Sequence, residues 1–334
     1  MNKTMCISDK EYTVISRGLS GTLYRLDSDT LVKVFGDGSR RERIEENIRL
    51  AELANRQGLP VAVPCGTVQL GSCLGALYQL PNAVTVDEAL RADSSRSEEY
   101  GHKMGRLFKK LHETDVGSWN LPMLSDKVTQ WIDALEKHHL CSEDAEQMRR
   151  IAGTLPTGSS LLYDDLHEGN VLVRDNEVML IDLDGACAGP KLYDMAAHRA
   201  LHIPHAERPE GVDFISVSLS PAQVEVMGYY TQLEYTDRTL GEGVFSRDSD
   251  GWLLPEQLGT FLMDINHKLD LLYSYRALLF LGRAAGSPML TPEHIRTILE
   301  HFVPMLRKIT APNSELDQLL TIQERLRKSE ELNQ

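Results

Sequence analysis

The sequence lacks the features of a secreted or membrane-embedded protein. Its first ten residues, MNKTMCISDK, contain no apolar signal core, and its longest nearly apolar run, LDLLYSYRALLFLG, is interrupted by Asp270 and Arg276. We therefore expect neither a signal peptide nor a membrane-spanning helix. The five cysteines are scattered and form no Cys-x-x-Cys pair. This pattern disfavours a disulfide framework or a zinc site and favours a reducing, cytoplasmic location.

The sequence is also short of positive charge. Its 35 Lys and Arg residues stand against 49 Asp and Glu residues, which gives a formal net charge of −14 at pH 7. Nucleic-acid binding needs clustered Lys and Arg to contact phosphates, so this balance argues against a nucleic-acid partner. An acidic surface suits a cationic substrate, although acidic surfaces are common and mostly aid solubility.

What the sequence does contain is a globular composition divided into two kinds of region. Of its 334 residues, 42% are hydrophobic and 25% are charged. Residues 11–80 hold five strand-like runs and one inserted amphipathic helix, which predicts a five-stranded antiparallel sheet. From Val86 onward helical patterns dominate, apart from a β hairpin at 171–182, and the charged segment from Gln323 is expected to be a solvated helix end. We predict an α+β fold with a small antiparallel β-rich N-terminal lobe (1–80) and a larger, mainly helical C-terminal lobe (81–334).

Two acidic clusters flank the predicted hairpin. The first lies in LLYDDLHEGNVLV, residues 161–173, and the second ends the next apolar run in VMLIDLDGA. A two-residue turn at Asp175 and Asn176 would set Asn170 opposite Ile181, whereas a three-residue turn would set it opposite Asp182. In the first register the side chains of Asn170 and Asp182 fall on opposite faces unless the backbone deviates. We expect the two clusters to converge.

Convergence of these oxygens predicts phosphoryl-transfer chemistry. Mg²⁺ prefers amide and carboxylate oxygens, with phosphates and water completing its shell. Asp165 precedes Asn170 by five residues, the spacing of phosphoryl-transfer loops in which the Asp accepts the proton of the acceptor hydroxyl and the Asn holds a metal ion. Asp182 would be the second metal ligand. The alternative is a pair of polar turns that merely cap a hairpin.

Phosphate contacts are expected in the N-terminal region. Lys33 is the single charged residue of the run TLVKVF, and a cation there needs an anionic partner or an exposed face. The turn RGLSG offers Ser20 and Gly21, where backbone N–H groups could approach a phosphate. On the following helix Glu46 or Glu45 is expected to pair with Lys33, and solvation explains the other glutamates.

The ordered set of motifs resembles the aminoglycoside phosphotransferase and choline kinase family of protein-kinase-like enzymes. That family typically reads H-G-D-L-H-x-G-N, then a strand, then I-D-F-x-x-A-x-x-G-x-x-x-x-D-L-A. The matching segments here, spanning residues 11 to about 200, are GRLFKKLHE, DLHEGN and IDLDGACAGPKLYDMA. One departure is clear: the usual His-Gly before the catalytic Asp is Tyr163-Asp164, so the loop must be braced differently or the activity is reduced.

The resemblance implies a role for each matching residue. Asp165 would be the catalytic base and Asp194 a structural partner of its loop. Asn170 and Asp182 would be the ligands of Mg²⁺. Lys33 would contact the α/β-phosphates of ATP, and the connector around Gln79 and Leu80 would bind adenine through its backbone. GTP is an open alternative as the phosphate donor.

These features predict an ATP- and Mg²⁺-dependent phosphotransferase with a small-molecule partner. The acceptor would offer a hydroxyl group on an aminoglycoside, an amino alcohol, a sugar or a related metabolite, and its site would lie after residue 200. The catalytic loop would span 163–170 and the metal-binding hairpin 171–184. One alternative is a nucleotide-binding pseudokinase with little turnover, favoured by Tyr163. A protein kinase is disfavoured because no Asp-Phe-Gly or Ala-Pro-Glu bounds an activation segment.

Overall fold

The structure of the chain is a computed structural model. It describes residues 5–7, 12–18, 21–35, 41–70, 73–154, 157–191, 193–194, 282 and 314–332. These residues fall into two compact units. The first unit holds the described residues of 5–120 and 165–186, and the second holds those of 121–164, 187–194, 282 and 314–332.

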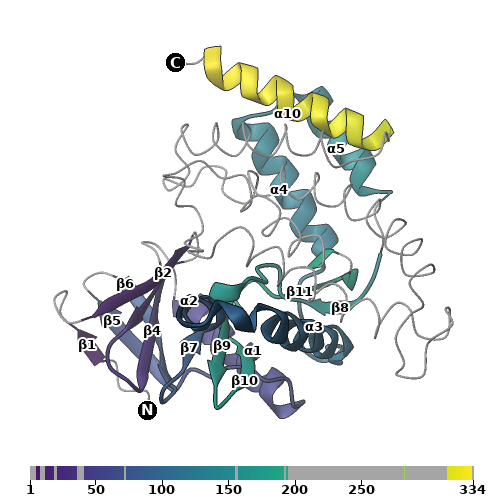
Figure 1. The fold of residues 1–334 in the computed structure, drawn as a ribbon. Helices are drawn as coiled ribbons and strands as arrows, with labels where there is room; N and C mark the ends of the chain where they lie inside the picture. Colours follow the sequence, from purple (N-terminus) through teal and green to yellow (C-terminus); the bar gives the residue numbers. More distant parts are fainter. Residues whose placement is uncertain are drawn as a thin grey trace, which may run out of the picture. The chain divides into compact units, whose positions relative to one another are not determined.

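A six-stranded sheet forms the start of the first unit (Figure 1). Its strands are β1 (Met5–Ile7), β2 (Thr13–Gly18), β3 (Gly21–Arg25), β4 (Thr30–Phe35), β5 (Gly66–Leu70) and β6 (Cys73–Gln79), in the order β1-β5-β6-β4-β3-β2. The five predicted antiparallel strands are confirmed. The prediction was wrong in its count, because β1 adds a sixth strand that pairs in parallel with β5. A three-residue strand is too short to carry an alternating pattern, so hydrophobic periodicity cannot predict it.

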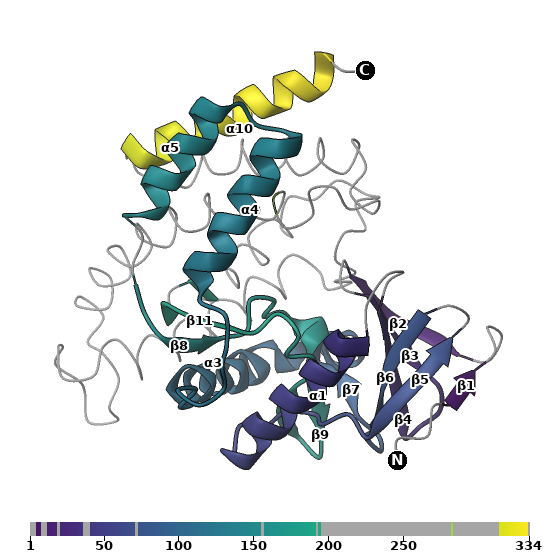
Figure 2. The ribbon, with the colours of Figure 1, turned by 180° about the vertical axis from the view of Figure 1, so that it is seen from behind.

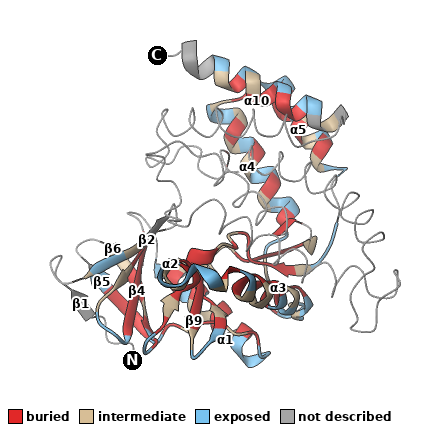
Figure 3. Cartoon of the chain, viewed as in Figure 1, coloured by how far each residue is buried: buried red, intermediate tan, exposed pale blue. Residues whose placement is uncertain are grey.

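Helix α1 (Arg41–Arg56) packs on this sheet through an apolar stripe. Ile44, Ala51 and Ala54 are buried, as the period of 3.6 residues predicts. The helix ends at Arg56, and two residues later Gly58 has a φ of 79°, the left-handed conformation that glycine adopts without strain. Ile44 joins a buried cluster with residues of β3, β4 and β6, and Figure 3 shows β4 buried along its length.

The rest of the first unit carries the hairpin. It consists of β7 (Val84–Thr85), α2 (Val86–Ala92), the 3₁₀ helix η1 (Ser94–Arg96), α3 (Ser97–Glu113), the 3₁₀ helix η2 (Glu168–Asn170), β9 (Val171–Arg174) and β10 (Glu177–Leu180). Strands β10, β9 and β7 form a three-stranded sheet in that order. The hairpin joins the core of the large sheet, because Leu172 and Ile181 lie in the same buried cluster as Ile44.

The second unit is helical with one small sheet. It contains α4 (Leu124–His138), α5 (Ser142–Ala152), β8 (Ser160–Leu162), β11 (Cys187–Gly189) and α10 (Ser314–Leu332). Helix α5 contacts both α4 and α10 (Figure 2). The expectation of a merely solvated end from Gln323 is wrong: Gln323 and Leu326 are buried, and Arg325 pairs with Asp144 of α5 at 2.7 Å. The many charged residues of this segment made its buried face difficult to predict from the sequence.

None of the helices within the described ranges combines the length and the apolar character that crossing a membrane requires.

Candidate active site

The turn of the hairpin decides how the two acidic clusters meet. Asp175 and Asn176 have φ values of 52° and 65°, the left-handed pair that a two-residue hairpin turn requires. Glu177 pairs with Arg174, so the two-residue register holds. The N–H of Ile181 accordingly donates to the carbonyl of Asn170 at 3.1 Å.

The backbone deviates where the register demands it. With Asn170 opposite Ile181, regular strand geometry would turn the side chain of Asp182 to the other face. Asp182 has a φ of 70°, which breaks the alternation at that residue. This φ is uncommon for a non-glycine residue, and the backbone there is held by the surrounding contacts.

The carboxylate of Asp182 is held by two side chains of the N-terminal region. Lys33 of β4 forms a buried ion pair with its Oδ2. Asn47 of α1 donates from Nδ2 to its Oδ1 at 2.5 Å. The predicted pairing of Lys33 with Glu46 or Glu45 is therefore wrong, and both glutamates are exposed. Glu46 lies on the exposed face of α1 and pairs with Arg49 at 2.5 Å, and the helical period places Asn47 on the buried face instead.

Asp184 is held by the same helix. Arg43 of α1 donates from both Nε and Nη2 to Oδ2 of Asp184. The guanidinium of Arg43 also lies 5.4 Å from the ring centroid of Phe35, and Lys33 lies 5.6 Å from the same centroid. Two cations therefore flank one buried aromatic ring beside two buried carboxylates.

Burial and crowding shift the pKa values in this cluster. Burial first, and the charge of Asp184 second, raise the pKa of Asp182 from 3.8 to about 6, although Lys33 opposes them. Burial also acts to raise the pKa of Asp184, but Lys33 and Arg43 outweigh it and hold that pKa below its usual value. Burial opposes the charge of Lys33, and the combined carboxylates, Asp165 among them, outweigh it and raise the pKa of Lys33.

Asp165 and Asn170 form the solvent-facing part of the site. The side chain of Asp165 is 45% exposed. Asn170 donates from Nδ2 to the Asp165 carbonyl at 2.9 Å and to its carboxylate at 3.1 Å. Because the amide nitrogen is used in this way, the amide oxygen of Asn170 points away from Asp165. Because the N–H of Ile181 donates to the carbonyl of Asn170, the segments that carry the two clusters lie side by side, as predicted.

The chain before Asp165 belongs to the second unit and is braced by Asp194. Its carboxylate accepts the N–H of Tyr163 at 2.7 Å and the N–H of Asp164 at 2.9 Å. Asp194 is fully buried, as is suited to the structural role that the resemblance implies. Asp164 has a φ of 71°, a conformation glycine adopts freely and aspartate tolerates better than most residues.

The connector after β6 has few backbone donors left. The N–H of Leu80 donates to the carbonyl of Asp29 at 2.7 Å, and the N–H of Asn82 donates to the carbonyl of Ser28 at 3.0 Å. Pro81 has no N–H. Base recognition by this stretch would therefore rest on carbonyl groups, and Gln79, Pro81 and Asn82 are its exposed residues.

The predicted phosphate loop is described only in part. Ser20 lies outside the described residues. Gly21 has a φ of 149°, and a Cβ there would come within 2.2 Å of the carbonyl oxygen of Val34. Only glycine fits this close approach of β3 to β4. The predicted acceptor region after residue 200 also lies outside the described residues, apart from Gly282 and 314–332.

Sequence reasoning missed three residues of the cluster: Arg43, Asn47 and Tyr78. Asn47 did carry a signal, because it is the polar member of the buried stripe of α1, three residues after Ile44. Tyr78 of β6 is fully buried, and its hydroxyl has no hydrogen-bond partner among the described residues. Burial first, then the charges of Asp182 and Asp184, raise the pKa of Tyr78 well above 10.

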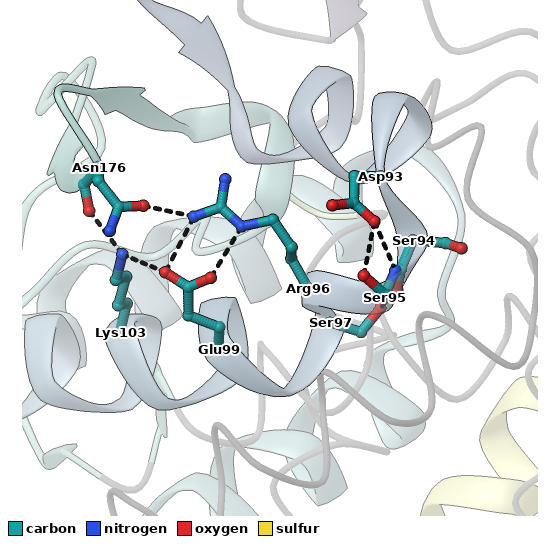
Figure 4. A network of polar contacts seen from close by, with 8 residues as sticks. All are labelled: Asp93, Ser94, Ser95, Arg96, Ser97, Glu99, Lys103 and Asn176. Atoms are coloured by element: carbon teal, nitrogen blue, oxygen red, sulfur yellow. Dashed lines mark hydrogen bonds and ion pairs between the residues drawn. The ribbon is translucent and has the colours of Figure 1, made fainter.

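The far end of the hairpin carries a second polar network, shown in Figure 4. Arg96 donates to Oδ1 of Asn176, and Lys103 of α3 donates to the carbonyl of Asn176 at 2.5 Å. Both cations also pair with Glu99, and their hydrogen bonds lower the pKa of Glu99 from 4.5 to about 2. Helix α3 thereby fixes the turn between the two strands.

The chemistry of the donor set fits a divalent cation that is shared with phosphates. Asp165, Asp182 and Asp184 outnumber the cations Lys33 and Arg43, so the cluster has an excess of negative charge. Among the described residues, His, Cys, Asp and Glu form no group of three or more that could hold a metal ion alone. A metal bound by Asn170 and Asp182 would therefore need oxygens from a ligand.

Comparison with known proteins finds one matching family and several similar structures. The sequence profile of a Phosphotransferase enzyme family (APH) matches residues 11–218. The amicoumacin kinase hAmiN, solved with AMP-PNP, Ca²⁺ and Ami, has a TM-score of 0.55 and 13% identity, with 95% of this chain and 94% of that chain covered. The gentamicin complex of APH(2'')-IIa has a TM-score of 0.51 and 14% identity, with 89% and 93% covered.

A third similar structure is a choline/ethanolamine kinase family protein from Mesorhizobium loti. Its TM-score is 0.50 and its identity 13%, with 96% of this chain and 93% of that chain covered. No curated protein matches the chain. The structural likenesses confirm the predicted α+β, protein-kinase-like fold.

Proposed function

Because the chain belongs to the Phosphotransferase enzyme family, whose profile matches residues 11–218, we propose that it transfers the γ-phosphoryl group of ATP to a hydroxyl group of a small molecule, with Mg²⁺ as the metal. GTP is the alternative donor. Residues 1–80 would form the nucleotide-binding lobe and residues 81–334 the lobe with the catalytic loop, the metal-binding hairpin and the acceptor site.

The observation that carries this proposal is the buried pair between Lys33 and Asp182. An ion pair that is removed from water costs desolvation free energy and is weak evidence for stability. This pair also lies beside a second carboxylate, Asp184, which raises the cost further. Such an arrangement is accounted for when phosphates and a metal ion complete the charge balance.

The residues then divide the chemistry between them. Asp165, half-exposed and oriented by Asn170, would accept the proton of the acceptor hydroxyl and direct its oxygen at the phosphoryl group. Lys33 would hold the α/β-phosphates. Asn170 and Asp182 would hold Mg²⁺, which when bound neutralises charge on the phosphates. Positioning and electrostatics supply most of the rate in this reaction class.

Cationic acceptors are the first candidates. The formal net charge of the chain is −14, and the structures similar to it include a gentamicin complex and a choline/ethanolamine kinase family protein. An aminoglycoside or an amino alcohol would place ammonium groups against acidic residues. Sugars and related metabolites are the second group to test.

Thermal unfolding with Mg·ATP, alone and with an acceptor panel, tests the proposal. A ligand that binds only the native state raises its free energy of unfolding by RT ln(1 + [L]/Kd), so the unfolding temperature should rise by several degrees well above Kd. Phosphate transfer to one panel member should follow. Stabilisation without transfer to any acceptor or to water would support the pseudokinase alternative, and no stabilisation at all would remove the proposal.

A further inference from the structure

We propose that helix α1 positions the metal site through Asn47 and Arg43. These residues belong to the same helix as the glutamates that were predicted to pair with Lys33. Asn47 holds Asp182 and Arg43 holds Asp184. The inference rests on the proposed function, because Asp182 is the metal ligand there.

The geometry links one helix face to one short segment. Arg43 and Asn47 are four residues apart, so their side chains lie on the same face of α1. Their partners, Asp182 and Asp184, are two residues apart and follow the hairpin directly. Asp182 lies two residues beyond the end of β10 and has a φ of 70°, so side-chain contacts rather than ladder bonds set the direction of its carboxylate.

Each oxygen of Asp182 has its own donor. Oδ2 faces Lys33 and Oδ1 faces Nδ2 of Asn47. Asn47 is fully buried, so this hydrogen bond forms away from water and fixes the carboxylate firmly. Side chains that orient a metal ligand in this way typically affect metal affinity 10–100-fold, roughly, when they are removed.

An amide suits this position better than a carboxylate does. Three carboxylates already face two cations in the cluster. A glutamate or aspartate at position 47 would add a fourth negative charge, whereas asparagine gives a donor without charge. Arg43 supplies the matching cation for Asp184 and reaches it from the edge of the cluster, with 39% of its side chain exposed.

Four variants test the inference: Asn47→Ala, Arg43→Gln, Arg43→Lys and the control Arg56→Gln. Arg56 is on the same helix, its side chain is 72% exposed, and its ion-pair partner among the described residues is Glu52. Calorimetric binding of a non-hydrolysable ATP analogue is measured across a Mg²⁺ titration. Thermal unfolding of each ligand-free variant is measured beside it to separate folding from positioning.

Asn47→Ala should raise the half-saturating Mg²⁺ concentration about 10–100-fold, while analogue affinity at saturating Mg²⁺ stays near that of the wild type. Arg43→Gln should raise the half-saturating Mg²⁺ concentration about tenfold. Arg43→Lys should raise it much less, because lysine keeps the positive charge. Arg56→Gln should behave as wild type. Should Asn47→Ala fail to fold, the two Arg43 variants still decide, because that side chain is partly exposed.

Two contrary results have different meanings. If the wild type binds the analogue with a Mg²⁺ dependence that Asn47→Ala and Arg43→Gln leave within twofold, α1 only packs against the site and the inference is wrong. If the wild type does not bind the analogue at any Mg²⁺ concentration, the proposed function fails, and the inference fails with it.

Discussion

The two ends of the β9–β10 hairpin both carry charged networks, and these networks differ in burial, in charge balance and in the direction of their pKa shifts. At the turn, Glu99 meets Arg96 and Lys103 near the surface, and cations outnumber the carboxylate (Figure 4). At the other end, the buried Asp182 and Asp184 and the partly exposed Asp165 together outnumber the cations Lys33 and Arg43. The pKa of Glu99 is lowered to about 2, whereas that of Asp182 is raised to about 6.

We propose that the network at the turn supports the fold and that the network at Asp182 binds ligands. Opposite charges that meet in water satisfy each other and stabilise the turn modestly. Like charges that are gathered away from water destabilise the ligand-free fold, and proteins keep such arrangements where a ligand completes them. The excess of carboxylate at Asp182 therefore supports our proposal that the metal ion and the phosphates bind at this end.

The largest expected effect comes from one substitution made at both ends. Asp182→Asn should lower kcat by at least about 10²–10³ and abolish stabilisation by Mg·ATP, because it removes the charge of the metal ligand. Asp175→Asn, in the turn, should change neither, since Asp175 is 91% exposed and asparagine accepts its φ of 52°. Steady-state kinetics and thermal unfolding check both variants. Equal loss in the two would remove the distinction.

Lys33→Met tests the buried end through stability. The substitution leaves buried carboxylates without their main cation, which should lower the free energy of unfolding by about 3–5 kcal/mol. The control is Lys109→Met on α3, where Lys109 pairs with Glu113 at the surface and should matter by less than about 0.5 kcal/mol. Urea unfolding measures both. A small effect of Lys33→Met would mean that its ion pair is not desolvated in solution.

The sequence was sufficient for the fold and for the residues that periodicity and turn chemistry control. The five strands, the inserted helix and the two possible registers of the hairpin all followed from local patterns. The residues of α1 that face the cluster did not, because the choice among residues 42–47 depends on how α1 is rotated against the sheet. Long-range packing sets that rotation, and a buried asparagine has no fixed preference in sequence patterns.

The pH dependence of stability should have opposite signs at the two ends. The folded pKa of Asp182, about 6, lies above its ordinary 3.8. Its contribution to stability is therefore complete below 3.8 and is lost as pH rises through about 6. The folded pKa of Glu99, about 2, lies below its ordinary 4.5. Its contribution is present above 4.5 and is lost as pH falls towards 2, reduced by solvent screening.

Chemical unfolding of metal-free protein checks these signs. Asp182→Asn should gain stability relative to the wild type as pH rises from 4 to 7, as a trend and apart from any constant offset. Glu99→Gln should have a lower free energy of unfolding than the wild type at pH 5, and this difference should shrink as pH falls to 3. A slope of the same sign for both variants would contradict the contrast between the two ends.

The smallest expected effects are at Asn176, where the conformation of the turn can be separated from its ion network. Asn176→Gly keeps the φ of 65° without strain but removes the acceptor of Arg96, so the free energy of unfolding should change by less than about 1 kcal/mol. Asn176→Ala removes the same acceptor and adds left-handed strain, which should cost about 1–2 kcal/mol more. Neither should change the half-saturating Mg²⁺ concentration for analogue binding. If both variants shifted that concentration, the network at the turn would be coupled to the metal site along the hairpin, and the two ends would act together.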